Sequence, residues 1–374
     1  MSKSVTFLIG NGFDIKVGLK TRYTDFYPIY IKDYNSEEIK DRTIIEKFKK
    51  QILATQAENW KDWKDFEIGM GQQSKCFDGE NPADDFIKCF SNFAVCFNNY
   101  LNKECKKIDW DAVDQTLCNK FILSITHFYE YTKSVLSNTI SDLFHHSGSE
   151  PAEINFIQFN YTNAFDELVK KSNLSQQLSA ELGRLNSLNT LGLNLHVHGK
   201  MNDYPTIGVN DESQIENETI RNDPRVRQEF VKPNYLDLLE SDNVNKNIAR
   251  TDAISVINES NLICSFGVSI GASDKYWWEK IGKWLTNTSG VFVIFDICDD
   301  GEDDGINPDD VFVHRRRLSE RKKEITDRFM SLANINSEWL NKNPNKIIVE
   351  LNSDLFSFKL PKKEERKPEQ TIVA

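Results

Sequence analysis

Long apolar runs are missing from this sequence. In 374 residues no apolar stretch approaches the roughly 18 residues that a membrane-spanning helix needs. The apolar segment at residues 5–9 is also too short, and too soon followed by Gly10, for a secretory signal peptide. We therefore expect a cytoplasmic protein without a membrane partner.

Paired cysteines are missing as well. The seven cysteines are odd in number and contain no C-x-x-C pair, so neither a disulfide framework nor a zinc ribbon is indicated. Most of them lie in a region with helical periodicity, where Cys89 and Cys96 are one heptad apart, which favours buried, reduced thiols. We expect no metal cofactor.

The chain has no excess of positive charge. Its formal net charge is −11 at pH 7, whereas a surface that attracts nucleic acid needs a cationic face. The densest basic segment, residues 314–323, follows the acidic residues 296–310, which could neutralise it within the fold. Nucleic acid is therefore not an expected partner.

Seven apolar segments have the length and composition of β-strands. They lie near residues 5–10, 154–160, 193–198, 205–209, 261–267, 290–296 and 346–351, and several are continuous runs typical of a sheet covered on both faces. Residues 25–150 instead show helical periodicity, for example in the stripe formed by Phe86, Phe90, Phe93 and Phe97.

These patterns predict an α/β, Rossmann-like fold with a largely parallel sheet and a long helical insertion after the first strand. The core would consist of residues 1–24 and 151–360, and the insertion of residues 25–150. Residues 361–374 carry charges and prolines without an apolar face, which predicts a flexible tail.

A Gly-Asn-Gly turn follows the first predicted strand, in VTFLIGNGFD at residues 5–14. Gly10, Asn11 and Gly12 could let backbone N–H groups approach a phosphate. Ile15 stands where a dinucleotide-binding fingerprint has its third glycine, so a dehydrogenase is not predicted. Glycines also serve any tight strand-to-helix connection, but the position of this turn favours nucleotide binding.

Further predicted strands also end in polar clusters, which suggests one shared crevice. Asn160 and Thr162 follow INFIQF, and the Asn160 carboxamide could hold a water or a ribose hydroxyl, or alternatively satisfy the turn or cap the next helix. Gly267, Ser269 and Asp274 follow NLICSF. Ser269 and Asp274 could contact ribose or phosphate, although a helix dipole alone also favours an acid at position 274.

An H-x-H pair ends the segment LNLHVHGK. His196 and His198 are two apart on a predicted strand, so both should point to one side, with Gly199 letting a ligand approach the backbone. His198 lies nearer the strand end and is the better candidate for a general base, because imidazole titrates near neutral pH. The alternatives are structural histidines or a metal site, which lacks an obvious third ligand.

An aromatic and acidic segment, residues 60–67, places Trp60, Trp63 and Glu67 on one side of a predicted helix. Glu67 would then be a charged residue among apolar neighbours, with a raised proton affinity that suits a role in a cleft. A salt bridge at the edge of the core is the alternative.

Taken together, the motifs resemble those of the AbiH family of bacteriophage abortive-infection proteins. They are FLIGNGFDIKVGLKTRYTDF at the start, W-x-x-W-x-D-F-E ending at Glu67, FNYT at 159–162, HVHG at 196–199 and FGVSIGASD ending at Asp274. The resemblance spans most of the chain in order, and the first motif is the most specific.

The same order is similar, more remotely, to sirtuin-like NAD-consuming domains. In that comparison Asn160 corresponds to the carboxamide that positions water or ribose, and His198 to the base. Asp14 stands where the sirtuin turn has serine, and Thr162 where an Asn-x-Asp motif has its acid. Protein deacetylation is not expected, because paired zinc-ribbon cysteines are missing.

The resemblance implies an antiphage effector that binds NAD or a related nucleotide and hydrolyses its N-glycosidic bond. The glycine turn would then bind phosphates, Asn160 would orient water or the 2′-hydroxyl, and His198 would remove a proton. Asp14 or Glu67 would stabilise the positive charge that develops on the ribose.

Two alternatives stay open. One is a metal-dependent nuclease or phosphodiesterase built on His196, His198 and acidic neighbours. The other is a non-catalytic nucleotide sensor or interaction protein. A phage or host trigger protein and a homo-oligomer are further expected partners, because a permanently active cell-killing enzyme would harm its host.

Overall fold

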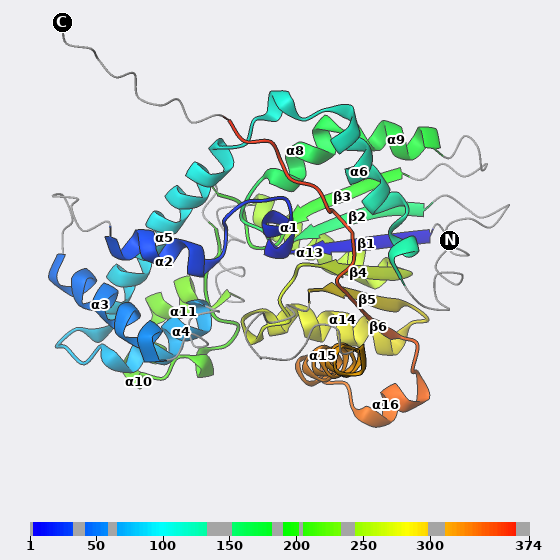
Figure 1. Ribbon diagram of the computed structural model, residues 1–374. Helices are drawn as coiled ribbons and strands as arrows, with labels where there is room; N and C mark the ends of the chain where they lie inside the picture. Colours follow the sequence, from blue (N-terminus) through cyan, green and yellow to red (C-terminus); the bar gives the residue numbers. More distant parts are fainter. Residues whose placement is uncertain are drawn as a thin grey trace, which may run out of the picture.

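Six parallel strands form the centre of the protein in the computed structural model, which describes residues 3–32, 42–58, 66–132, 152–181, 190–201, 205–232, 244–297 and 311–363 (Figure 1). The strands are β1 (Lys3–Ile9), β2 (Ala152–Gln158), β3 (Thr190–His196), β4 (Leu262–Phe266), β5 (Val291–Asp296) and β6 (Ile347–Leu351). Their order is β3-β2-β1-β4-β5-β6, with every neighbouring pair parallel. This is the order of a Rossmann-like sheet, so the predicted fold class is confirmed.

One predicted strand is wrong. Residues 205–209 form no strand, and Val209 makes only an isolated bridge to Val231. Ile207 and Val209 are nevertheless buried, in the same hydrophobic cluster as Phe230. The apolar pattern there reflects packing against helices instead of pairing in the sheet.

Alternate residues of the strands feed two hydrophobic clusters, one on each face of the sheet. Phe7 and Ile9 belong to the cluster that contains Phe165, whereas Leu8 belongs to the cluster that contains Trp278. The first face is covered by α6 (Gln115–Thr126), η3 (Phe128–Tyr131) and α8 (Ala164–Lys171), and the second by α13 (Val244–Glu259), α14 (Lys275–Asn287) and α15 (Val311–Leu332). Because successive side chains of a strand point to opposite faces, burial of both faces produces the continuous apolar runs.

A helical lobe, residues 23–32, 42–58, 66–106 and 205–232, lies beside the edge at which the strands end (Figure 1). It contains α2 (Tyr23–Lys32), α3 (Arg42–Glu58), α4 (Phe66–Gln73), η1 (Ser74–Cys76), α5 (Pro82–Lys106), η5 (Glu212–Gln214), α10 (Glu218–Asn222) and α11 (Pro224–Phe230). The Phe230 ring packs edge-on against Phe86, with centroids 5.1 Å apart. The lobe therefore combines two distant stretches of the chain, whereas α6 and η3, within the predicted insertion, cover the sheet. Trp60 and Trp63 lie outside the described residues.

Helix α5 illustrates how the sequence produces the lobe. It begins at Pro82 with Asp84 in its first turn and ends with Lys106 in its last, which suits both proline geometry and the helix dipole. Its predicted aromatic stripe is buried as expected, and Phe93 stacks on Phe66 of α4. These contacts hold α4 against α5 within the lobe.

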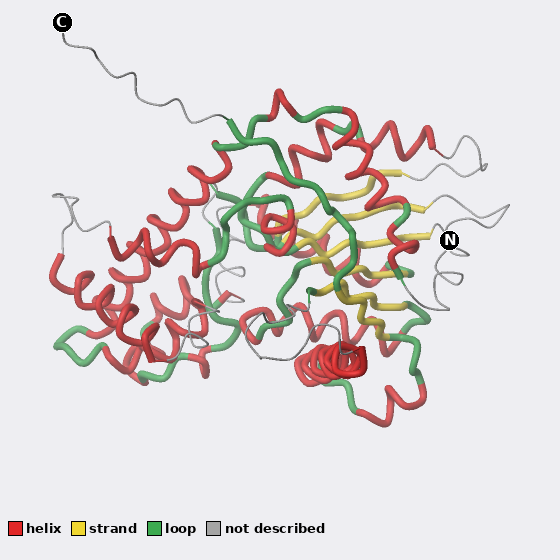
Figure 2. The backbone as a smooth tube through the Cα atoms, in the orientation of Figure 1, coloured by secondary structure: helices red, strands yellow, loops and turns green. Residues whose placement is uncertain are grey.

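Shorter elements complete the fold. They are α1 (Asn11–Lys16), η2 (Trp110–Ala112), α9 (Leu174–Glu181), η6 (Ala272–Asp274) and α16 (Ser337–Lys342). In Figure 2 the loops that follow the strands lie between the sheet and the helices of the lobe. Residues 361–363, the start of the predicted flexible tail, hydrogen-bond to residues 107–109, and the remaining tail lies outside the described residues.

No helix within the described ranges is both long and apolar enough to cross a membrane.

Candidate functional site

A cavity of about 900 Å³ lies at the carboxyl ends of the strands. Its walls come from the carboxyl ends of the strands and the segments that follow them, from α15, and from the helical lobe. Because the chain connections leave β1 and β4 in opposite directions, this is the switch point where Rossmann-like sheets bind ligands. The predicted site residues that line it are Gly10, Asn11, Gly12, Asp14, Glu67, Asn160, Thr162, His198, Gly267, Ser269 and Asp274.

The glycines at this edge pack against one another. A Cβ atom on Gly12 would lie 2.4 Å from the Gly267 Cα, and Gly267 has a positive φ of 65°. The Gly10 N–H donates to the Phe266 carbonyl at 3.0 Å, and the Gly12 N–H donates to the Gly267 carbonyl at 2.8 Å. These glycines therefore permit two turns to meet, and the Gly10 and Gly12 N–H groups, two of the three predicted to bind phosphate, already have partners in the protein.

Asn11 fixes the segment that precedes α2. Its amide donates to the Thr21 carbonyl at 3.1 Å, and the Thr21 hydroxyl donates back to Asn11 Oδ1. The next residue, Arg22, is exposed on the cavity wall, and its guanidinium has no partner among the described residues. Sequence reasoning missed Arg22, although it lies inside the first family motif; it is a better phosphate candidate than the glycine N–H groups.

Asp14 is buried in the cavity wall, with 1% of its surface exposed. The Thr162 hydroxyl donates to both of its carboxylate oxygens, at 2.9 and 2.8 Å. Burial raises the pKa of Asp14 from 3.8 to about 7, although Thr162 and the nearby Asn160 amide oppose the shift. This carboxyl group therefore changes charge near neutral pH.

Asn160 follows β2 and is 2% exposed. Neither its amide nitrogen nor its amide oxygen has a hydrogen-bond partner among the described residues. The amide lies close enough to lower the pKa of Asp14 but is not aligned for a hydrogen bond to it. A buried amide with both functions unused is costly to folding, which marks Asn160 as a candidate ligand contact.

His198 is also buried, and its Nε2 atom lies 3.0 Å from Asp274 Oδ1. The contact is close but misaligned, so Nε2 has no well-formed hydrogen bond to any described residue. Burial lowers the pKa of His198, and Lys232 lowers it further, against the opposing effect of Asp274. The imidazole is therefore uncharged at neutral pH.

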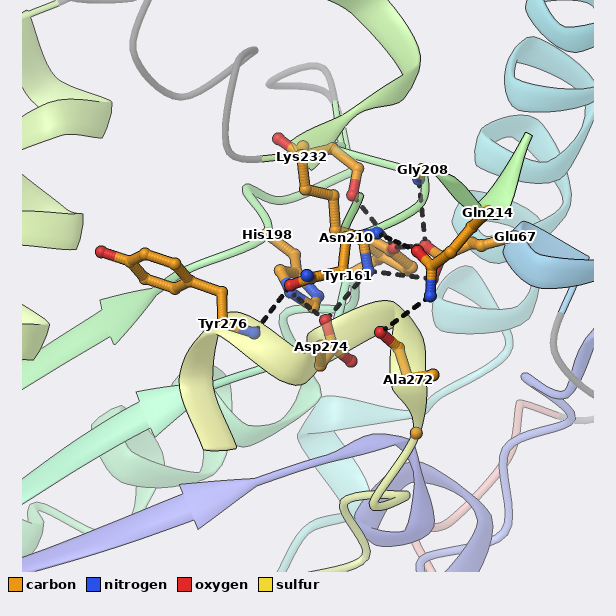
Figure 3. A network of polar contacts seen from close by, with 12 residues as sticks. Glu67, Tyr161, His198, Gly208, Asn210, Gln214, Lys232, Ala272, Asp274 and Tyr276 are labelled. Atoms are coloured by element: carbon orange, nitrogen blue, oxygen red, sulfur yellow. Dashed lines mark hydrogen bonds and ion pairs between the residues drawn. The ribbon is translucent and has the colours of Figure 1, made fainter. Parts of the chain in front are cut away.

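Lys232 joins the lobe to this site (Figure 3). Its Nζ donates to Glu67 Oε2 at 2.8 Å and to Asp274 Oδ1 at 2.9 Å. The Tyr161 hydroxyl and the Gly208 N–H both donate to Glu67 Oε1 at 3.2 Å. Glu67 is thus buried as predicted, but in a salt bridge, which was the alternative interpretation.

The charges of this network stabilise one another. Burial alone would lower the pKa of Lys232, but Asp274 and Glu67 more than offset it and raise that pKa. Burial would likewise raise the pKa of Asp274, but Lys232 and His198 hold it well below its usual range. Lys232 and Asp274 are therefore charged at neutral pH.

The two histidines of the H-x-H pair do not share a site, which corrects their predicted common orientation. β3 ends at His196, whose Nε2 lies 3.0 Å from Asp166 Oδ2, whereas His198 lies in the following turn and faces the cavity. Across the described ranges, no group of three or more His, Cys, Asp or Glu side chains is placed to hold a metal ion. The H-x-H pair therefore does not supply the metal site of the nuclease alternative.

Fold and site together define a Rossmann-like α/β protein with a buried polar crevice at its switch point. The profile of the bacteriophage abortive infection AbiH family matches residues 6–296, which include all of the predicted site residues. The chain therefore belongs to this family, which places it in bacteriophage abortive infection. No curated protein matches the chain.

Proposed function

We propose that the crevice binds NAD or a related nucleotide and that the protein hydrolyses the N-glycosidic bond of this ligand during abortive infection. The observation that carries the proposal is the unpartnered amide of Asn160, 2% exposed, at the switch point. A ribose offers hydroxyls that both donate and accept hydrogen bonds, as does an attacking water, and a carboxamide complements either.

The dimensions of the crevice suit a nucleotide. Its volume of about 900 Å³ lies near the upper end of the roughly 300–1,000 Å³ usual for ligand pockets. The exposed guanidinium of Arg22 at its wall is available to a phosphate. Ser269, which is exposed on the same wall, could contact a ribose or phosphate oxygen.

The reaction divides among three side chains. Water attacks ribose C1′, the bond from C1′ to the base nitrogen breaks, and its electron pair leaves with the base. Asn160 orients the water, and His198, uncharged at neutral pH, accepts the proton that the water releases. Asp14, in its ionised form, stabilises the positive charge on the ribose. Glu67 is less suited to this, because Lys232 already neutralises it.

Loss of NAD would stop phage production in the infected cell. A phage or host protein that triggers the activity, or self-assembly that completes it, would keep the uninfected host alive. The metal-dependent nuclease is less favoured, because His196 and His198 bind to different acids.

The test compares wild type with Asn160→Ala and His198→Ala in bacteria challenged with phage, with cellular NAD and nucleic-acid integrity followed together. We expect NAD to fall in wild type, and both variants to lose this effect and the protection. Asn119→Ala and His127→Ala are matched controls, because these residues lie on or after α6, outside the cavity.

Each other outcome contradicts the proposal in its own way. Protection with unchanged NAD would exclude the glycohydrolase, and nucleic-acid breakdown in the same samples would favour a nuclease. NAD binding by purified protein, with protection but without turnover in infected cells, would identify a sensor.

A further inference from the structure

We propose that Lys232 is a positioning residue, which holds the Asp274 carboxylate so that the neighbouring His198 imidazole stays uncharged and able to accept a proton. The role of His198 as base rests on the proposed function, whereas the effect of Lys232 on its charge does not. No sequence motif identified Lys232.

Two groups compete for one carboxylate oxygen. Lys232 Nζ lies 2.9 Å from Asp274 Oδ1, in a well-formed hydrogen bond, whereas His198 Nε2 lies 3.0 Å from the same oxygen in a misaligned contact. The Asp274 carboxylate is therefore oriented toward Lys232. Without the lysine, the carboxylate would be free to turn toward His198 and bind it as a protonated imidazolium, as acid–histidine pairs do.

The charge of His198 depends on this competition with Lys232 for Asp274, as the other groups around the imidazole show. The charged groups in contact are Asp274 and Lys232, with Glu67 behind Lys232. Tyr161, whose ring centroid is 6.1 Å from that of the imidazole, is held un-ionised by burial, which raises its pKa, and Phe159 contributes a ring and a carbonyl. Because these groups are buried, each charge acts on the imidazole with little screening.

The positioning charge comes from the helical lobe. Glu67 lies on α4 and Lys232 follows α11, whereas His198 and Asp274 follow strands of the sheet. Glu67 fixes Lys232 from the lobe side at 2.8 Å. The lobe therefore controls the charge of His198 and also forms part of the cavity wall.

The test removes Lys232 together with one of the two carboxylates that it neutralises, so that the remaining one, Asp274, can be neutralised by a proton on His198. Lys232→Met alone would strand two buried carboxylates and endanger folding, so the main variant is Glu67→Gln/Lys232→Met, which removes one charge of each sign. Glu67→Gln is the matched control, because it keeps the lysine on Asp274. Lys232→Arg preserves the cation.

The primary readout is the pKa of His198, followed by NMR of the labelled imidazole in the full chain, with circular dichroism to confirm folding. We expect the pKa to rise in the double variant and to stay near the wild-type value in Glu67→Gln and Lys232→Arg. An unchanged pKa in the folded double variant would refute the positioning role.

Activity supplies the second readout. At pH 7 the double variant should lose roughly tenfold or more in kcat for NAD hydrolysis, with KM little changed, and should recover as the pH is raised. A loss that does not depend on pH would point to a purely structural role. If wild type does not hydrolyse NAD, the proposed function fails while the NMR titration still decides the role of Lys232.

Discussion

Two clusters of the same three residue types lie at the carboxyl edge of the sheet, and they differ in burial and in hydrogen bonding. The outer cluster consists of Asp166, His196 and Lys200. The inner cluster consists of Asp274, His198 and Lys232.

The outer cluster is a well-bonded tie between β2, β3 and α8. Asp166 also accepts hydrogen bonds from Gln158 at 2.7 Å and Asn194 at 2.8 Å, and the Lys200 side chain is 43% exposed. In the inner cluster the Lys232 side chain is 7% exposed and the His198 contact is misaligned. The same chemistry is structural where it is saturated with partners, and suited to reaction where burial leaves a polar atom unused.

The largest expected difference between the clusters is energetic. Lys232→Met should lower the free energy of unfolding by about 3 to 5 kcal/mol, because two buried carboxylates lose their cation. Lys200→Met should cost no more than about 1 kcal/mol, because that lysine is largely hydrated already. Urea denaturation at pH 7 measures both, and equal losses would mean that the clusters do not differ as described.

Asp14 tests how burial, as distinct from ion pairing, changes the free energy of unfolding with pH. Its pKa rises from 3.8 to about 7 in the folded protein, so the folded state holds a proton that the unfolded chain releases between these values. The free energy of unfolding should therefore fall by about 3 kcal/mol as the pH increases from 4 to 7. Asp14→Asn should remove this slope and be more stable than wild type at pH 8.

In the same experiment, the contribution of Asp166 to stability should change with pH in the opposite direction to that of Asp14. Burial opposes the shift, but His196 and Lys200 hold the pKa of Asp166 well below its usual range, so its contribution is present at neutral pH and lost as the pH falls. Asp166→Asn should thus be less stable than wild type at pH 7, with the gap narrowing in acid. Parallel pH profiles for the Asp14 and Asp166 variants would contradict the assignment.

The smallest expected effect compares two buried asparagines of the β2 segment. Asn155 accepts from the Leu193 N–H at 2.7 Å, so Asn155→Ala should cost about 1 to 3 kcal/mol by leaving that donor unpaired. Asn160→Ala removes an amide without partners and should change the free energy of unfolding by less than about 1 kcal/mol.

A ligand sharpens this last comparison. NAD in excess should raise the melting temperature of wild type and of Asn155→Ala, because a ligand that binds the folded state stabilises it. Asn160→Ala should lose most of that increase. A full increase in Asn160→Ala would remove Asn160 from the binding site.

Sequence reasoning located the crevice because the carboxyl ends of parallel strands meet at one edge. That rule predicts from the sequence that Asn160 and Asp274 share a crevice, and both line the cavity. It could not find Lys232, which follows a lobe helix and reaches the site only through the packing of that lobe. The H-x-H spacing misled because β3 ends at His196, so the two-residue period no longer applies at His198.

The glycine turn teaches a different lesson. Gly10 and Gly12 were expected to be small so that a phosphate could approach, whereas the nearby group is the backbone of Gly267. A sequence shows that a side chain is excluded but not what excludes it. The segment at 205–209 is similar, because burial against helices and pairing in a sheet produce the same apolar pattern.

The central position of β1 in the sheet has a consequence for folding during synthesis. β1 pairs with β4, whose residues leave the ribosome about 250 residues after it, or roughly 10 to 50 s later at ordinary rates of synthesis. Until then Gly12 has no Gly267 to pack against, and Lys232 has no Asp274 to hold. A nascent chain therefore lacks the assembled crevice while it is being made, and so does any fragment that ends before residue 274.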